Sequence, residues 1–116
     1  MVEADAVLVG IGAVPRTGLA EAAGLPVDGA IIVDATLATA DPDVFAAGDV
    51  CAFPNPMATE LMRLECWKNA DGQGALAARN MLGACESCVD VPWFWSDQYE
   101  LMLQMAGGAR AGRGHG

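Results

Sequence analysis

The chain has 116 residues, of which 53% are hydrophobic, and its formal net charge is −9. This length is enough for one small domain, and the hydrophobic content excludes a chain that is disordered by composition. The acidic balance argues against nucleic-acid binding, which needs clustered lysine and arginine, and no apolar run approaches the ~20 residues of a membrane span. The start of the chain lacks the basic and then apolar profile of a signal peptide, so we expect a cytoplasmic protein with reduced cysteines.

The first third of the chain predicts two strands separated by a short helix. Residues 6–10 are apolar and predict a buried strand, which as a central strand would need neighbours on both sides. Thr17 is suited to cap a short helix through Ala23, and Gly24 occupies the usual position for its end. Residues 30–33 predict a second apolar strand.

The segment around Asp49 carries the clearest sign of a ligand site. Residues 44–47 predict a short buried strand, and Gly48 would let a ligand approach the backbone closely because it has no Cβ. Asp49 then follows at the carboxyl end of the strand, where open α/β sheets bind ligands. Its carboxylate could accept hydrogen bonds from sugar or polyol hydroxyls, although a solvated aspartate after a strand is the simpler alternative.

One long helix is predicted from residue 65 or 66 to residue 82, with Gly83 as its stop. Its predicted buried face consists of small or apolar residues at three- and four-residue spacing, namely Ala70, Gly74, Ala77, Ala78 and Met81.

The C-terminal part predicts a strand from residue 99 to residue 105 with one solvated face. Trp93 and Trp95 share a face before it, and simple sheet packing accounts for them about as well as a ligand-binding role. Residues 107–116 have no hydrophobic periodicity, and we expect a disordered tail there.

The four cysteines raise a second class of function, a non-enzymatic thiol or zinc module. Cys85 and Cys88 form a lone Cys-x-x-Cys, which is a weak metal or redox signal. We predict that the four cysteines do not form one metal site. The reason is that Cys66 and the Cys85–Cys88 pair flank the long helix, whose ends lie about 25 Å apart.

Several segments resemble one enzyme family. Residues 39–50 resemble the second flavin-binding motif of the FAD-dependent pyridine-nucleotide oxidoreductases. Residues 7–15 look like the strand that leads from the NAD domain back to the FAD domain, and residues 63–70 look like the start of the flavin-facing helix. Residues 92–99 look like the entry to the C-terminal interface domain. Together they are similar to ferredoxin, putidaredoxin and rubredoxin reductases.

The resemblance implies an α/β fold, namely a fragment of a doubly wound FAD/NAD(P)-binding flavoprotein with the start of an α+β interface domain. Residues 1–15 would end the NAD-binding domain, and residues 16–90 would form the C-terminal part of the FAD-binding domain. Residues 91–106 would begin the interface domain, followed by the tail of residues 107–116.

The resemblance also implies four cofactor-binding residues. Asp49 would hold the ribityl chain of FAD, with Gly48 allowing close approach. The Trp67 backbone would bind the pyrimidine edge of the flavin at the positive end of the helix, and its indole would border the isoalloxazine. Trp95, with Trp93, would form a wall beside the flavin. No catalytic residue and no metal ligand is predicted.

The implied function is part of an NAD(P)H-dependent ferredoxin reductase, in which electrons pass from a nicotinamide through FAD to a ferredoxin-type iron–sulfur protein. Arg63 and Lys68 could contact an acidic ferredoxin. A nitrite reductase subunit or an NADH oxidase is the alternative within the same superfamily. Neither of the two Gly-x-Gly-x-x-Gly fingerprints that bind FAD and NAD is present, so we expect a truncated chain that is inactive alone. The sequence leaves open whether a partner chain completes the fold.

Overall fold

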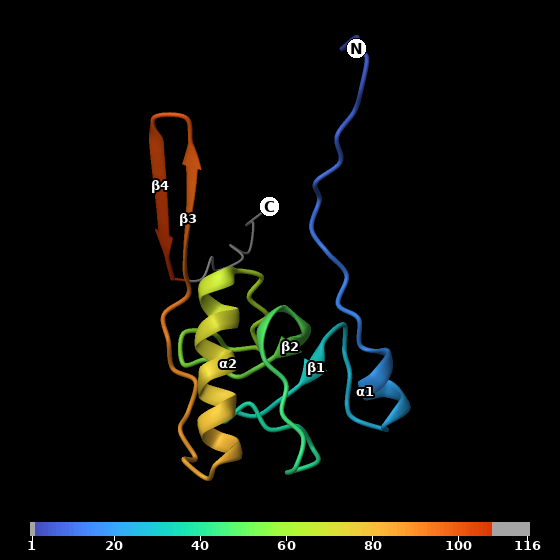
Figure 1. The fold of residues 1–116 in the computed structure, drawn as a ribbon, viewed down its shortest axis with the longest axis vertical. Helices are drawn as coiled ribbons and strands as arrows, with labels where there is room; N and C mark the ends of the chain where they lie inside the picture. Colours follow the sequence, from blue (N-terminus) through green and yellow to red (C-terminus); the bar gives the residue numbers. More distant parts are fainter. Residues whose placement is uncertain (1, 108–116) are drawn as a thin grey trace, which may run out of the picture.

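The computed structural model of the chain describes residues 2–107. Along these residues the elements are α1 (Gly18–Ala22), β1 (Ile31–Ile32), the 3-10 turn η1 (Gly48–Val50), β2 (Cys51–Ala52), α2 (Trp67–Met81), β3 (Trp93–Gln98) and β4 (Leu101–Ala106). Figure 1 shows α2 at the centre of the body, with β1 and β2 between it and α1.

The core lies between α2 and the short sheet. Strands β1 and β2 pair in parallel, with Ile31 opposite Cys51 and Ile32 opposite Ala52. The predicted strand of residues 30–33 is therefore confirmed, although only its middle is paired. The residues that fill the core come from all the surrounding segments: Val33, Leu37, Ala46, Cys51, Phe53, Leu76, Ala77 and Cys88.

The long predicted helix is confirmed as α2, but its predicted buried face is only partly correct, since Ala77 is buried and Ala70 half-buried. Gly74, Ala78 and Met81 are exposed, and the buried residues are Gln73, Leu76, Ala77 and Asn80. The reason is that two amide side chains on α2 bind the backbone of neighbouring loops. Asn80 Nδ2 donates to the carbonyls of Thr36 and Glu86 at 2.7 and 2.9 Å. A hydrophobic pattern cannot predict a helix face that is buried through its hydrogen bonds.

The strand predicted at residues 44–47 does not form. Only Phe45 makes a bridge, with Ala38, and the Ala46 N–H donates to the Leu37 carbonyl at 3.1 Å. The segment pairs with its own preceding loop because Asp34 folds that loop back. The Asp34 carboxylate accepts hydrogen bonds from Thr36 Oγ1 and from the backbone N–H groups of Thr36 and Ala38. An aspartate that binds the backbone in this way is typical of tight turns.

The strand predicted at residues 6–10 is also absent. These residues are extended and exposed, and Leu8 is 97% accessible. Within the described part of the chain no other strand pairs with them. An apolar segment gains strand structure only when neighbours supply hydrogen bonds and cover its two faces.

The C-terminal elements β3 and β4 form an antiparallel hairpin with a two-residue turn, Tyr99 and Glu100. The predicted strand therefore begins two residues later, at Leu101. The prediction that only one face of this strand is solvated is wrong, because every residue of β4 is exposed. The expectation that Trp93 and Trp95 share a face is confirmed, since their rings stack at 5.2 Å. Gly107, at the start of the predicted tail, donates its N–H to the Pro92 carbonyl, and residues 108–116 lie outside the described range.

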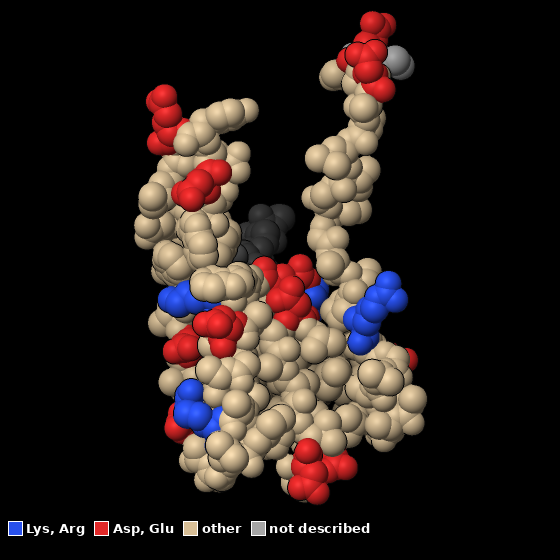
Figure 2. All heavy atoms as spheres, viewed as in Figure 1, with Lys and Arg blue, Asp and Glu red and all other residues tan. Residues whose placement is uncertain are grey.

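Two arms project from the body in the same direction (Figure 1). We call residues 2–15 the N-terminal arm and residues 93–106 the hairpin arm. The radius of gyration is 17.1 Å, against about 13 Å for a compact chain of this length. Figure 2 shows acidic side chains toward the far end of each arm and uncharged surface along most of the rest. Among the described residues, no helix is long and apolar enough to cross a membrane.

Candidate cofactor site

The turn that carries Asp49 is fixed against α2. Gly48 has φ +79°, and a Cβ at this position would lie 3.3 Å from the Cβ of Ala70. The Gly48 N–H donates to Oε1 of Gln73 at 2.8 Å. Glycine is therefore required here by the backbone conformation and by the close packing of η1 on α2. Its role in close approach of a ligand stays a prediction.

Asp49 is exposed and lines a cleft of about 250 Å³. The other residues of this cleft come from the base of the N-terminal arm and the segment before α2: Ala13, Val14, Pro15, Arg16, Val50, Arg63 and Glu65. Arg63 and Glu65 form an ion pair. Within residues 2–107 no hydrogen bond or ion pair occupies the Asp49 carboxylate, so its oxygens are available to a ligand with hydroxyl groups.

The N-terminus of α2 carries no side-chain cap. The N-cap residue is Cys66, which makes no capping hydrogen bond, and the first amide to bond back is that of Ala70, to the Cys66 carbonyl at 3.1 Å. The amides at the start of a helix have no partner within the helix and carry partial positive charge. This end of α2 is therefore suited to accept an electron-rich group.

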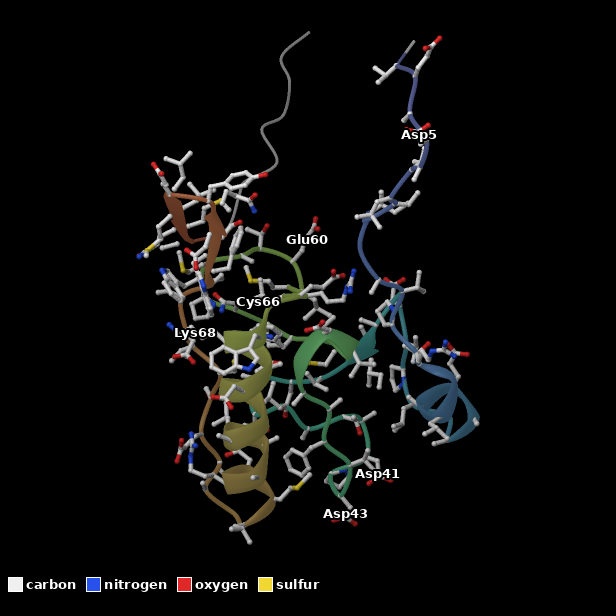
Figure 3. All side chains as sticks on the ribbon, turned by 45° about the horizontal axis from the view of Figure 1, so that its top comes forward. Asp5, Asp41, Asp43, Glu60, Cys66 and Lys68 are labelled. Carbon is white, nitrogen blue, oxygen red and sulfur yellow. The ribbon has the colours of Figure 1, made fainter. Side chains whose placement is uncertain are left out.

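Three tryptophans that are scattered in the sequence meet where α2 approaches the hairpin arm. Trp67 packs edge-on against Trp95 with ring centroids 6.1 Å apart, and Trp95 stacks on Trp93. Trp67 is nevertheless 71% exposed. Lys68 Nζ lies 4.7 Å from the ring centroid of Trp93, and Figure 3 shows Lys68 and Cys66 together at this end of α2.

The four predicted cofactor-binding residues thus fall into two groups on one end of the molecule. Gly48 and Asp49 belong to the turn beside the cleft, whereas Trp67 and Trp95 belong to the aromatic cluster. None of the three tryptophans lines the cleft, as far as residues 2–107 are concerned. The link between the groups is α2, which begins at Trp67 and holds the Asp49 turn through Ala70 and Gln73.

Gln73 is a site residue that the sequence analysis missed. It is 2% exposed, and its amide contacts η1, β2 and the segment after α2. The sequence did contain a signal, because Gln73 lies on the same helical stripe as Ala70 and Ala77. A buried amide on that stripe must find hydrogen-bond partners in neighbouring segments.

The cysteines are placed differently from the prediction. The chain after Cys85 turns back along α2, so Cys88 is buried beside Gln73 rather than beyond the helix end. Cys51 lies on the other side of that amide, 3.4 Å from Oε1. Burial, followed by the neighbouring Cys88, raises the pKa of Cys51 to about 11. Cys85 is exposed, and the described residues contain no group of three or more His, Cys, Asp or Glu that could hold a metal ion.

Comparison with known proteins gives two family matches. The sequence profile of the pyridine nucleotide-disulphide oxidoreductases matches residues 1–74, and that of a reductase C-terminal domain matches residues 93–114. The chain is 50% identical over 112 residues to the ferredoxin–NAD(+) reductase component of the anthranilate 1,2-dioxygenase system of Burkholderia cepacia, covering 97% of this chain and 28% of that protein. It is 40% identical to putidaredoxin reductase of Pseudomonas putida, covering 90% and 25%.

Solved structures agree with these matches. A ferredoxin reductase from Rhodopseudomonas palustris superposes with a TM-score of 0.76 at 41% identity, over 82% of this chain and 24% of that one. A covalent putidaredoxin reductase–putidaredoxin complex gives a TM-score of 0.82 at 40% identity, over 90% and 25%. The chain thus spans about a quarter of the length of the relatives it matches.

Proposed function

The chain belongs to the pyridine nucleotide-disulphide oxidoreductase family, and on that premise we propose that it forms part of an NAD(P)H-dependent, FAD-containing ferredoxin reductase. Its predicted α/β class, a piece of a doubly wound flavoprotein, is confirmed by the likeness to solved ferredoxin reductases. The single observation that carries the proposal is Asp49, an exposed carboxylate that follows Gly48 and lines a cleft. The predicted domain boundaries after residues 15, 90 and 106 are part of this proposal.

The residues of the site fit one part of FAD and not the rest. The Asp49 carboxylate can accept two or more hydrogen bonds from the ribityl hydroxyls, because its oxygens have no partner among residues 2–107. The uncapped amides at Trp67 suit the electron-rich pyrimidine edge of the flavin. A cleft of about 250 Å³ holds only a portion of such a cofactor, and the sequence lacks the Gly-x-Gly-x-x-Gly fingerprint of a pyrophosphate-binding turn.

When bound, FAD would supply the hydride-accepting and single-electron-donating chemistry, and the chain would supply orientation. Asp49 would fix the ribityl chain, which sets the position of the attached ring. Trp67 and Trp95 would exclude water from one side of the ring, because their indoles already form a packed apolar cluster.

An acidic ferredoxin-type iron–sulfur protein is the partner that this proposal implies. Relatives of the chain are named as ferredoxin reductases, and one solved relative is a complex with putidaredoxin. On this chain Lys68 is exposed beside the aromatic cluster, whereas Arg63 is engaged by Glu65. Lys68 is therefore the better candidate for contact with an acidic partner.

The test replaces Asp49 in a complete reductase. The chain is grafted into the Burkholderia cepacia reductase component in place of the matching 28% of that protein. Asp49→Ala removes charged hydrogen bonds that contribute about 1.5–3 kcal/mol each, so FAD affinity should fall roughly 10- to 100-fold. Equilibrium dialysis with FAD measures the change.

Asp43→Ala is the matched control, since Asp43 is an exposed aspartate outside the cleft. It should leave FAD affinity and the urea midpoint unchanged. If Asp49→Ala binds FAD as tightly as the Asp43→Ala control, Asp49 is not a ribityl ligand and the proposed site is wrong.

A further inference from the structure

We propose that Gln73 is a positioning residue for the cofactor, because its buried amide sets the orientation of the turn that presents Asp49. This inference rests on the proposed function for the identity of the ligand. Gln73 is not one of the predicted cofactor-binding residues, which include Asp49 and Trp67.

The contact between Gln73 and the turn is short and buried. Oε1 accepts the Gly48 N–H at 2.8 Å, and Gly48 and Gln73 are separated by 25 residues in the chain. Ala70, one helical turn before Gln73, packs against the same turn, since a Cβ at Gly48 would lie 3.3 Å from the Ala70 Cβ. Gln73 thus holds the Ala47–Gly48 peptide, and Ala70 packs closely on Gly48 itself, so the backbone that leads directly into Asp49 is fixed on α2.

The chemistry of the contact favours glutamine over similar side chains. Oε1 lies 2.8 Å from the Gly48 nitrogen and 3.4 Å from Cys51 Sγ, while Nε2 donates to Cys88 Sγ at 3.8 Å. An apolar side chain of the same length would leave the buried Gly48 N–H without an acceptor. A carboxylate would keep the acceptor but would place a charge among buried thiols.

Removing the amide should therefore affect the ligand site more than the fold as a whole. Gly48 has a positive φ, and because glycine adopts other backbone conformations about as readily, the turn depends on its contacts with α2 to keep this one. Without Gln73, the Gly48 N–H must turn toward water to find a partner, and Asp49 must move with it.

Asn80 provides a matched control on the same face of α2. It is also a buried amide, and it binds the backbone of Thr36 and Glu86 rather than the Asp49 turn. Asn80→Leu and Gln73→Met each replace one buried amide by an apolar side chain of similar length. Both should lower stability, but only Gln73→Met should disturb the turn.

The first readout uses the ¹⁵N-labelled 116-residue chain without ligand. Amide exchange at Gly48 should be slow in the parent chain and in Asn80→Leu, and at least roughly tenfold faster in Gln73→Met, because the loss of one buried hydrogen bond is worth about 1.4 kcal/mol. Gln73→Glu, which keeps an acceptor for Gly48, should restore part of the protection. If Gly48 exchanges equally slowly in Gln73→Met, the proposal is wrong.

The second readout is FAD affinity in the grafted reductase. Gln73→Met should weaken FAD binding roughly tenfold more than Asn80→Leu, with Gln73→Glu between the parent and Gln73→Met. Equal losses in Gln73→Met and Asn80→Leu would mean a merely structural role and would overturn the proposal. Failure of the proposed function would give a different pattern. Asp49→Ala would then leave FAD binding intact, while Gln73→Met would still accelerate amide exchange at Gly48 in the chain without ligand.

Discussion

At the scale of single residues, the cysteine thiols lie in contrasting environments. Cys85 is exposed and has φ +53°, whereas Cys51 is fully buried and Cys88 nearly so. Burial is the largest cause that raises the pKa of both buried thiols, and each lies against the Gln73 amide. The Cys-x-x-Cys spacing thus joins one exposed and one buried thiol.

We expect this contrast in thiol labelling. At pH 8 an aromatic disulfide reagent should modify Cys85 within seconds, and it should modify Cys51 and Cys88 only as fast as the chain unfolds. Mass spectrometry of peptides after a short pulse measures the order. Rapid modification of Cys88 in the folded chain would contradict the burial seen here.

The raised pKa of Cys51 also predicts a loss of stability in alkali. Its pKa rises from 9.0 to about 11 on folding, so above pH 9 the unfolded chain binds fewer protons than the folded one. Stability is therefore full below pH 9 and is lost as the pH rises toward 11, by about 1 kcal/mol at pH 10. Urea midpoints at pH 8 and pH 10 measure this loss. Cys51→Ala should show a smaller alkaline loss, and Cys85→Ser should retain the full loss.

At the scale of elements, the β3–β4 hairpin carries strain in its turn. Tyr99 has φ +54° and is fully exposed, although a bulky side chain disfavours this conformation. Two-residue hairpin turns normally place glycine, asparagine or aspartate where φ is positive. The side chain makes no packing contact that compensates for the strain within the described chain.

Replacing Tyr99 should therefore stabilise the hairpin. We expect Tyr99→Gly to raise the free energy of unfolding by about 0.5–1 kcal/mol, because it relieves positive-φ strain without loss of buried surface. Glu100→Gly is the control, since Glu100 is not among the positive-φ residues of the described chain, and it should give no gain. Urea unfolding followed by tryptophan fluorescence suits both variants, and a lower midpoint for Tyr99→Gly would rule out the strain.

At the scale of the whole molecule, the two arms expose an unusual amount of apolar surface. Leu8 and Ile11 are more than 90% accessible on the N-terminal arm, and Leu101 and Met102 are at least 70% accessible on the hairpin arm. Exposed apolar surface of this extent is typical of surfaces that other protein covers. The body, from which both arms project, has its own core around Leu37, Cys51 and Phe53.

We expect the 116-residue chain to bind a hydrophobic dye under native conditions through these arms. Leu8→Asp and Leu103→Asp should each lower the fluorescence of bound anilinonaphthalene sulfonate, because a charge interrupts the apolar patch. Leu19→Asp is the control, since Leu19 is 91% accessible on α1 and belongs to neither arm. An equal effect of all three substitutions would show that the dye does not select the arms.

The sequence by itself determined the long helix and the family. The extent of α2 follows from its hydrophobic spacing and from Gly83, whose φ of +92° ends the helix. The position of Asp49 after an apolar segment and a glycine predicts a ligand site, and Asp49 lines a cleft. These features depend on neighbours within a few residues, so a linear pattern contains them.

Only the tertiary structure decided which surfaces meet. Gln73 and Asn80 are buried because loops from distant parts of the chain offer them backbone partners, and Cys88 returns to the middle of α2. Residues 6–10 have the composition of a central strand, yet within the described residues nothing lies beside them to pair with. Hydrogen bonds between distant segments, and strand pairing, need two partners at once, and the pattern of one segment does not specify the other.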